Sequence, residues 1–310
     1  GWQIPIMGSN DFTKAKINKI DGKLILELMN NGEIPIIAGF QGIDKDNNIV
    51  TLGRGGSDTS AVAIAAAIRA DRCDIYTDVD GVYTTDPRIV KNAKKLDKIS
   101  YEEMLEFASL GAKVLQTRSV EMAMRHGVTV QVLSSQTGKT GTFLTKEDEK
   151  MENELVSGIA YSKDEANVTL INILDKPGVA TKIFTPLSEA NINVDMIVQT
   201  GSENGNKINF TYTVSRKDLE QTISIMEKNK IDIEFERIIT NNSLAKVSIV
   251  GLGMRTHTGV ANKMFSALAS KNINIHVIST SEIKISVLID EDSIEKALNS
   301  LHSTFELDQK

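Results

Sequence analysis

The first stretch that could do chemistry is Thr51-Leu52-Gly53-Arg54-Gly55-Gly56-Ser57-Asp58. Its glycines let the backbone turn tightly and approach a ligand. Ser57 or Asp58 could cap the helix that should follow, and the free N–H groups of a helix start favour an anion. The guanidinium of Arg54 matches carboxylate or phosphate groups. A plain glycine-rich turn is the alternative, but an arginine inside the run favours an anion-binding loop.

A second stretch, Tyr76-Thr77-Asp78-Val79-Asp80-Gly81-Val82-Tyr83-Thr84-Thr85-Asp86-Pro87-Arg88, directly follows an expected strand. Ligands of open parallel sheets bind at the carboxyl ends of strands. The aspartates and the arginine could therefore handle a magnesium nucleotide. An EF-hand calcium loop starting at Asp78 is excluded, because its sixth and twelfth positions would be Tyr83 and Ile89 instead of glycine and glutamate. A solvated Asp-Gly turn is the alternative.

Three further motifs are weaker. Lys113 follows an expected helix and a glycine, and its case depends on the two stretches above. Gly138-Lys139-Thr140 resembles the end of a phosphate-binding Walker A motif but lacks the earlier glycine, and Gly251-Leu252-Gly253 lacks the third glycine of a dinucleotide site. The lone cysteine, Cys73, and four histidines far apart in sequence give no zinc-ligand spacing, so we predict no metal site.

Composition limits the possible functions. The net charge of −6 and the pI of about 5.4 disfavour nucleic acid and anionic membranes as partners. A single cysteine excludes a disulfide within the chain and favours a cytoplasmic protein. We expect neither a membrane span, because no apolar run approaches the ~20 residues that one needs, nor a signal peptide. The start at Gly1-Trp2-Gln3, without methionine, indicates a cut or processed end.

The elements that must position these motifs alternate in the first half of the chain. We expect strands at residues 34–38, 74–77 and 128–133, with helices at 59–69 and 101–110. This rhythm predicts a mainly parallel sheet covered by helices. Residues 146–153 are charged without a core pattern, which predicts a linker or a solvated helix.

The second half contains an internal repeat with an offset of 81 residues. Gly178-Val179-Ala180 recurs as Gly259-Val260-Ala261, and Asn191-Ile192-Asn193 recurs as Asn272-Ile273-Asn274. Each copy reads strand, glycine loop, amphipathic helix, turn, two strands and a final helix. That order, βαββα with room for a last strand, predicts a ferredoxin-like sandwich. A pure scaffold is the alternative to a ligand cleft between the two copies.

Together these motifs resemble the aspartate kinase family over essentially the whole chain. Further matching signatures are Leu-Gly-Ala-Lys-Val-Leu at 110–115, Asp-Lys-Pro-Gly-Val-Ala at 175–180, Asn-Val-Asp-Met at 193–196 and Ser-Thr-Ser-Glu-Ile-Lys-Ile-Ser-Val at 279–287. The resemblance implies an α/β fold. An N-terminally truncated αβα sandwich of the amino-acid kinase type (residues 1–145) would precede a linker (146–156) and two ferredoxin-like βαββαβ ACT modules (157–240 and 241–310).

The resemblance also implies a reaction, the transfer of the γ-phosphoryl group of MgATP to the β-carboxylate of L-aspartate. This step begins the route to lysine, threonine and methionine. It would rest on positioning and charge neutralisation, because a carboxylate nucleophile needs no general base. The catalytic residues implied are Arg54, Ser57 and Asp58. Those implied for ATP and Mg2+ are Thr77, Asp78, Tyr83, Asp86, Arg88 and, on the phosphate side, Lys113.

The resemblance further implies allosteric sites for lysine, threonine or both in the ACT modules, which would pair in a homo-oligomer. In the first module the implied effector residues are Asp175, Lys176, Pro177, Gly178, Val179, Ala180, Asn193, Val194, Asp195 and Gln199. In the second they are Val260, Ala261, Asn274, Ile275 and Ser281.

One departure from the family pattern limits the expected activity. The family begins with a phosphate-cradling Lys-Phe-Gly-Gly-Thr-Ser stretch, which these 310 residues lack. We therefore expect little or no kinase activity from this polypeptide alone. A non-catalytic amino-acid sensor is the second hypothesis. A sister kinase acting on acetylglutamate or a nucleoside monophosphate is the third, and the tandem repeat argues against it.

Overall fold

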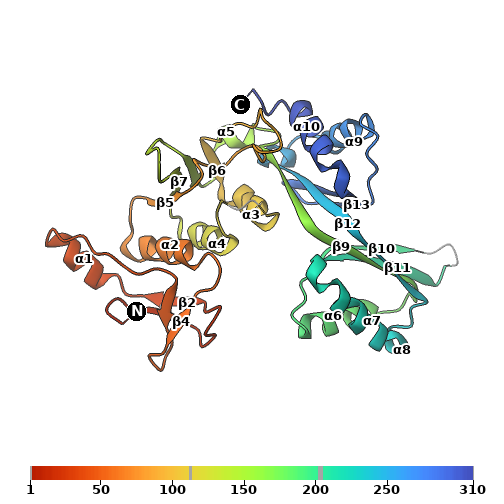
Figure 1. Cartoon of the computed structure of the whole chain (residues 1–310), viewed down its shortest axis with the longest axis horizontal. Coiled ribbons are helices and arrows are strands. Elements are labelled where there is room, and N and C mark those ends of the chain that lie inside the picture. The colour runs from red at the N-terminus through yellow and green to blue at the C-terminus, as the bar shows by residue number, and fades with distance from the viewer. Residues whose placement is uncertain (1, 112–113, 202–204, 310) are drawn as a thin grey trace.

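The computed structural model describes residues 2–111, 114–201 and 205–309 of the chain. Its N-terminal half carries two four-stranded sheets with helices, and its C-terminal half is built on one six-stranded sheet (Figure 1). Within the described ranges, no helix is long and apolar enough to cross a membrane.

The first sheet has the order β2-β1-β3-β4. Its elements are β1 (Ile6–Gly8), β2 (Ile17–Ile20), α1 (Lys23–Asn30), β3 (Gln41–Ile43) and β4 (Ile49–Thr51). The strand expected at residues 34–38 is wrong: this segment is irregular, and Ile34 and Ile36 are 89% and 96% exposed. Pro35 cannot donate a ladder hydrogen bond, which weakens any strand at this position.

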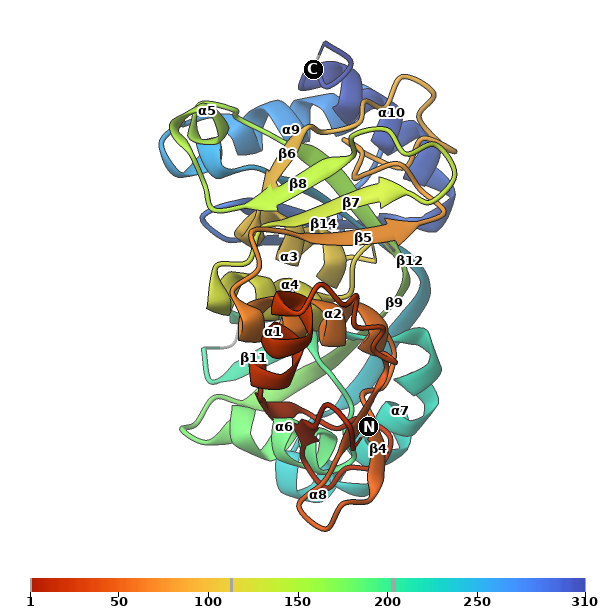
Figure 2. The ribbon, with the colours of Figure 1, turned by 90° about the vertical axis from the view of Figure 1, so that its left-hand side faces the viewer.

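The second sheet has the order β5-β7-β8-β6, and in Figure 2 its strands lie above α2 and α4. The pairs β5–β7 and β6–β8 are parallel and β7–β8 is antiparallel, so the sheet is mixed rather than fully parallel. Its elements are α2 (Gly56–Ile68), β5 (Cys73–Thr77), β6 (Lys98–Ser100), α3 (Tyr101–Ser109), α4 (Thr117–His126), β7 (Val130–Ser134) and β8 (Thr142–Thr145). Met104, Phe107 and Val120 pack with Val130 and Leu144 in the core between helices and sheet.

The third sheet has the order β10-β11-β9-β12-β14-β13 and contains both copies of the repeat. Its strands are β9 (Gly158–Leu174), β10 (Asp195–Gly201), β11 (Lys207–Val214), β12 (Arg237–Val250), β13 (Val277–Thr280) and β14 (Lys284–Asp290). Its helices are α6 (Val179–Glu189), α7 (Leu219–Lys228), α8 (Lys230–Ile233), α9 (Val260–Ala269) and α10 (Ile294–Thr304), with short 3-10 turns η1 (Arg216–Asp218), η2 (Leu252–Arg255) and η3 (Glu291–Ser293).

The two modules exchange their final strands through β9 and β12, the long strands in the middle of the sheet (Figure 1). The second half of β9 pairs with β11, and the start of β12 lies on its other side, so β12 supplies the last strand of the first module. Conversely, residues 158–162 of β9 pair with residues 246–250 of β12, beside β14. The N-terminal half of β9 therefore supplies the last strand of the second module.

The offset of 81 residues extends to backbone conformation. Gly178 and Gly259 before the first helix of each module have φ of 92° and 88°, and Asn191 and Asn272 after it have φ of 57° and 55°. Glycine and asparagine tolerate this left-handed region better than other residues. The repeated glycines and asparagines are thus explained by the turns that flank each helix.

The two halves of the chain are joined by buried polar contacts from α3. Glu103 is 1% exposed, and its Oε1 accepts hydrogen bonds from Ser157 Oγ and, at 3.2 Å, from the Leu252 amide of η2. Lys284 Nζ of β14 lies 2.6 Å from Glu106 Oε2. The expected linker also contributes, because Met151 of α5 (Glu149–Glu152) is buried against Leu252 and Ile283.

Candidate functional site

The glycine loop between β4 and α2 has the backbone that its sequence requires. Gly53 and Gly55 have φ of 74° and 70°, and a Cβ on Gly55 would lie 2.0 Å from Gln116 Cγ. The expectation that Ser57 or Asp58 caps the helix is wrong. The helix begins at Gly56 with Gly55 as its N-cap and no side-chain capping bond, because the left-handed glycine already turns the chain into the helix.

This loop presents unused hydrogen-bond donors. Arg54 is exposed and has no ion-pair partner in the part of the chain that the structure describes. The amides of Ser57 and Asp58 open α2 and likewise have no acceptor among those residues. Such a helix start attracts negative charge. Asp58 is half-buried and has no ion-pair partner within the described ranges, and its burial raises the pKa of its carboxyl group.

Arg118 of α4 holds the loop in place, and sequence reasoning missed it. Its guanidinium donates to the carbonyl oxygens of Leu52 at 2.5 Å and Ala15 at 2.7 Å. These bonds tie Leu52, just before the glycine loop, and Ala15, just before β2, to α4. Arg118 belongs to no recognisable motif, so no sequence signal pointed to this positioning role.

The second loop follows β5 at its carboxyl end, as expected. Thr77 Oγ1 donates to Asp78 Oδ1 at 3.0 Å, and the Tyr83 hydroxyl donates to Asp80 Oδ1 at 3.0 Å. Burial, reinforced by the Asp80 carboxylate, raises the pKa of the Tyr83 hydroxyl. Asp78 is exposed and pairs with no cation within the described residues, so it is free to face a cation that a ligand brings.

Asp86 and Arg88 at the end of this loop bind each other. Arg88 Nε and Nη2 lie 3.0 Å and 2.8 Å from the two carboxylate oxygens of Asp86. The hydrogen-bonded guanidinium holds the pKa of Asp86 below its usual range. The Arg88 side chain is 84% exposed, so it could swing toward a ligand only by leaving this pair.

A third segment, residues 135–141 after β7, lies beside the loop after β5. The Ser135 amide donates to the Thr77 carbonyl at 2.9 Å, and Lys95 Nζ donates to the Thr140 carbonyl at 2.7 Å. Lys139 is exposed in this segment. This segment lacks the earlier glycine of a Walker A motif, so its sequence alone did not mark it as a ligand site. It follows β7, however, which is parallel to β5, and that position is the signal that could have identified it.

No group of three or more His, Cys, Asp or Glu side chains could hold a metal ion in the described ranges. Lys113 lies outside the described residues. A cavity of about 520 Å3 lies along α2, and its lining is mostly apolar, with Ser57, Ser60 and Arg72 as its polar side chains.

In the first module, the expected effector residues fall in two places. Asp175, Lys176, Pro177 and Gly178 form an exposed loop before α6, where Lys176 Nζ pairs with Glu234 Oε1 at 2.6 Å. The side chain of Val179 packs in the core, while Ala180 is exposed. The second place is β10, with Asn193, Val194 and Asp195 at its start and Gln199 toward its end.

The two ends of β10 are far apart. Asp195 lies opposite Thr213 and so near Asn167 in the middle of β9, whereas Gly201 lies opposite Ile208 at the end of β9 that leads to α6. At ~3.3 Å per residue, Asp195 and Gln199 are roughly 13 Å apart. Asn193 to Asp195 are therefore far from the loop before α6, and Gln199, opposite Phe210 and so level with Leu170 of β9, lies between the two places.

The second module repeats this division and contains a cavity of about 430 Å3. Val260, Ala261 and Ser281 line it, whereas Asn274 and Ile275 lie at the opposite end of β13. Arg255 and His257 also line the cavity, and sequence reasoning missed both. The repeat could have found His257, since it stands 81 residues after Lys176.

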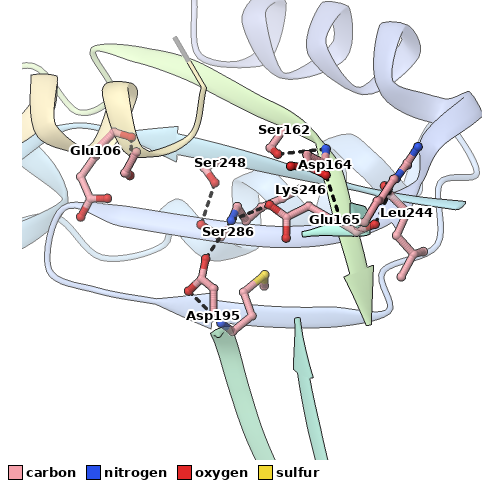
Figure 3. A network of polar contacts seen from close by, with 12 residues as sticks. Glu106, Ser162, Asp164, Glu165, Asp195, Leu244, Lys246, Ser248 and Ser286 are labelled. Carbon is pink, nitrogen blue, oxygen red and sulfur yellow. Dashed lines mark hydrogen bonds and ion pairs between the residues drawn. The ribbon is translucent and has the colours of Figure 1, made fainter. Parts of the chain in front are cut away.

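Asp195 is already paired with a lysine of the other module (Figure 3). Lys246 Nζ of β12 lies 2.7 Å from Glu165 Oε1 and 2.8 Å from Asp195 Oδ2. Burial alone would lower the pKa of Lys246, but the two carboxylates outweigh it and raise that pKa. At Asp195, burial alone would raise the pKa of the carboxyl group. The hydrogen-bonded Lys246 ammonium outweighs burial, so the pKa of Asp195 is lowered.

Models of known families match both halves of the chain. The amino acid kinase family matches residues 3–134, and ACT domains match residues 168–230 and 247–305. An aspartate kinase of Stutzerimonas stutzeri is 52% identical over 309 residues, which are 99% of this chain and 75% of that protein. Aspartokinase 2 of Bacillus subtilis is 48% identical over 307 residues, with the same coverage of 99% and 75%.

Solved structures give the same result. Escherichia coli aspartokinase III in complex with aspartate and ADP has a TM-score of 0.78 at 30% identity and covers 96% of this chain and 67% of its own. Clostridium acetobutylicum aspartate kinase has a TM-score of 0.82 at 27% identity, and the match covers 97% of this chain and 69% of that one. The expected fold, a kinase-type α/β unit followed by two ACT modules, is confirmed.

Proposed function

The chain belongs to the aspartate kinase family, and we propose that it transfers the γ-phosphoryl group of MgATP to the β-carboxylate of L-aspartate, giving 4-phospho-L-aspartate. The observation that carries the proposal is the glycine loop, where Arg54 and the amides of Ser57 and Asp58 have no partner among the residues that the structure describes. These donors suit the carboxylates of aspartate. The related Escherichia coli enzyme, solved with aspartate and ADP, supports the same substrates.

Each group has a proposed role in positioning. Arg54 binds a substrate carboxylate through its planar donors, and the helix start at Ser57 stabilises negative charge on the reacting oxygens. Asp58 lies beside the substrate, where its raised pKa limits repulsion of the incoming anion. MgATP supplies the phosphoryl group, and its magnesium neutralises charge on the phosphates. No general base is required, because the carboxylate nucleophile is already ionised.

We assign the nucleotide to the loops after β5 and β7. Thr77, Asp78 and Tyr83 lie at the carboxyl end of β5, and residues 135–141 lie at the equivalent end of its parallel neighbour. Asp86 and Arg88 form the outer end of the same loop, and Lys113 is proposed as a phosphate contact. In parallel sheets, loops at this edge are the usual ligand site.

The ACT modules are proposed to bind lysine, threonine or both. Since the two groups of effector residues in each module lie at opposite ends of an edge strand, one amino acid cannot touch both groups within a single chain. We propose that two copies pair through these modules and that each effector site combines one group from each copy. The structure of aspartokinase III with lysine and aspartate supports lysine as one effector of such modules.

The proposal is tested by aspartate-dependent ADP formation from two polypeptides. One is the 310-residue chain. The other, the extended polypeptide, carries before it the N-terminal segment of a relative that includes the Lys-Phe-Gly-Gly-Thr-Ser stretch. We expect turnover from the extended polypeptide and little from the chain alone. Effector binding without turnover in both forms would favour the sensor hypothesis instead.

A further inference from the structure

We propose that His302, on the last helix of the second ACT module, positions the nucleotide loop and thereby makes ATP affinity depend on that module. The nucleotide loop here means residues 77–88. The inference rests on the proposed assignment of this loop to ATP. It adds a positioning residue that lies far from the loop in sequence and in the opposite half of the chain.

The first observation is a buried hydrogen bond between the halves. His302 Nε2 lies 2.9 Å from Thr84 Oγ1, and the two residues are 2% and 0% exposed. The same Thr84 oxygen accepts a hydrogen bond from the Lys94 amide at 3.0 Å. The Thr84 hydroxyl is therefore fixed from both sides, in the residue that directly follows Tyr83.

The second observation is that β9, where it forms the last strand of the second module, holds the same loop. The Ile159 amide donates to the Thr84 carbonyl at 2.7 Å, and the Tyr161 hydroxyl donates to Asp86 Oδ2 at 3.1 Å. A Cβ on Gly158 would lie 2.5 Å from that carbonyl oxygen, so only glycine lets the strand approach so closely. Backbone and side chains of one module thus fix two residues of the loop.

The third observation is that the chain leaving the loop lies in the core of the second module. Val90 is buried in the cluster that contains Val156, Ile159 and Leu301, and Ile89 and Ala93 pack against it. Leu301 precedes His302 on α10. The outgoing end of the loop is therefore built on the same helix and strand that hold Thr84, and a shift of these elements must move the loop.

A polar pair at this position favours positioning over simple filling of space. Burying a hydroxyl and an imidazole is unfavourable unless they bond to each other, whereas apolar residues would pack without that constraint. A buried hydrogen bond has one good geometry, so it specifies how α10 and the loop must align. His302 acts through Thr84 and does not itself touch the substrate.

The experiment compares His302→Leu with His302→Gln, whose terminal amide can still bond to Thr84, and with His276→Leu as a matched control. His276 lies in the same module, is partly exposed and bonds to Asp290 at 2.9 Å. In the extended polypeptide we expect His302→Leu to raise KM for ATP about tenfold, from the loss of one buried hydrogen bond. KM for aspartate should stay within about twofold, and His302→Gln should recover most of the affinity for ATP.

A second measurement does not need turnover. Amide hydrogen exchange of residues 83–90 in the 310-residue chain should speed up in His302→Leu and in Thr84→Val, and should not change in His276→Leu. The inference would be overturned if exchange of residues 83–90 were unchanged in both His302→Leu and Thr84→Val. It would also be overturned if His302→Leu raised KM for ATP and KM for aspartate equally. Absence of turnover in the unsubstituted extended polypeptide would refute the proposed function, while the exchange result would still decide the contact.

Discussion

The buried ion triad between the modules predicts a large effect from one substitution, Lys246→Met. Lys246 and Glu165 have side chains only 7% and 8% exposed, 2.7 Å apart, whereas Asp195 is 59% exposed. Removing the ammonium leaves Glu165 buried without a partner, and breaking a buried pair in this way costs about 3–5 kcal/mol. Water around Asp195 screens its attraction to Lys246. Asp195→Asn alone should therefore lower the free energy of unfolding by about 1 kcal/mol or less.

Urea unfolding of the 310-residue chain, followed by circular dichroism, measures both values. The double variant Glu165→Gln/Lys246→Met removes both buried charges, and it should recover at least half of the loss seen in Lys246→Met. Met keeps the length of the lysine stem, so the change in packing is small. A stability loss below about 1 kcal/mol in Lys246→Met, or a double variant no more stable than the single one, would refute the assignment of Glu165 as its buried partner.

Three further predictions follow from other contacts. Gly55→Ala should destabilise the chain by about 1–3 kcal/mol, because φ is 70° there and Gln116 occupies the space of a Cβ; equal melting temperatures for variant and parent would contradict this. Burial lowers the folded-state pKa of His302 below its ordinary value of about 6.5. The unfolded chain therefore binds the extra proton first, so stability should fall as pH drops below about 6.5, and His302→Gln should flatten this slope; an equal slope in the variant would exclude His302 as the source. Lysine or threonine at 100 times its Kd should stabilise the folded chain by about 2.7 kcal/mol; if neither amino acid raises the melting temperature at millimolar concentration, the sensing proposal fails.

The sequence was most informative where a pattern repeats or where glycine is required. The offset of 81 residues predicted both modules, and the structure shows closely similar φ angles at Gly178 and Gly259, 92° and 88°. The helices at residues 59–69 and 101–110 were confirmed as α2 and α3. These features depend on local geometry, which a short stretch of sequence determines by itself.

Long-range partners could not be predicted in the same way. An apolar run predicted a strand at residues 34–38, but a strand also needs a neighbour, and none pairs with this segment in the described part of the chain. The strand exchange between β9 and β12 depends on pairing across about 80 residues. Nothing near His302 or Thr84 in the sequence indicates that they meet, because their contact follows from how the halves dock.

The effector residues show the same limit. The resemblance grouped Asp175 to Ala180 with Asn193 to Asp195, and the structure separates them along β10. Asp195 instead pairs with Lys246, its partner across the modules. The local sequence was enough to find each motif. Which other residues lie next to it depends on how the strands of the sheet pair, and local sequence does not show that.

The central claim, that Arg54 binds aspartate in a kinase reaction, is tested most directly by steady-state kinetics of Arg54→Ala in the extended polypeptide. Arg125→Ala is the matched control, since Arg125 is exposed at the end of α4 and has no ion-pair partner within the described residues. We predict a fall in kcat/KM for aspartate of about 100-fold, as for the loss of a charged hydrogen-bonding partner, with KM for ATP little changed. An unchanged kcat/KM for aspartate in Arg54→Ala would contradict the account.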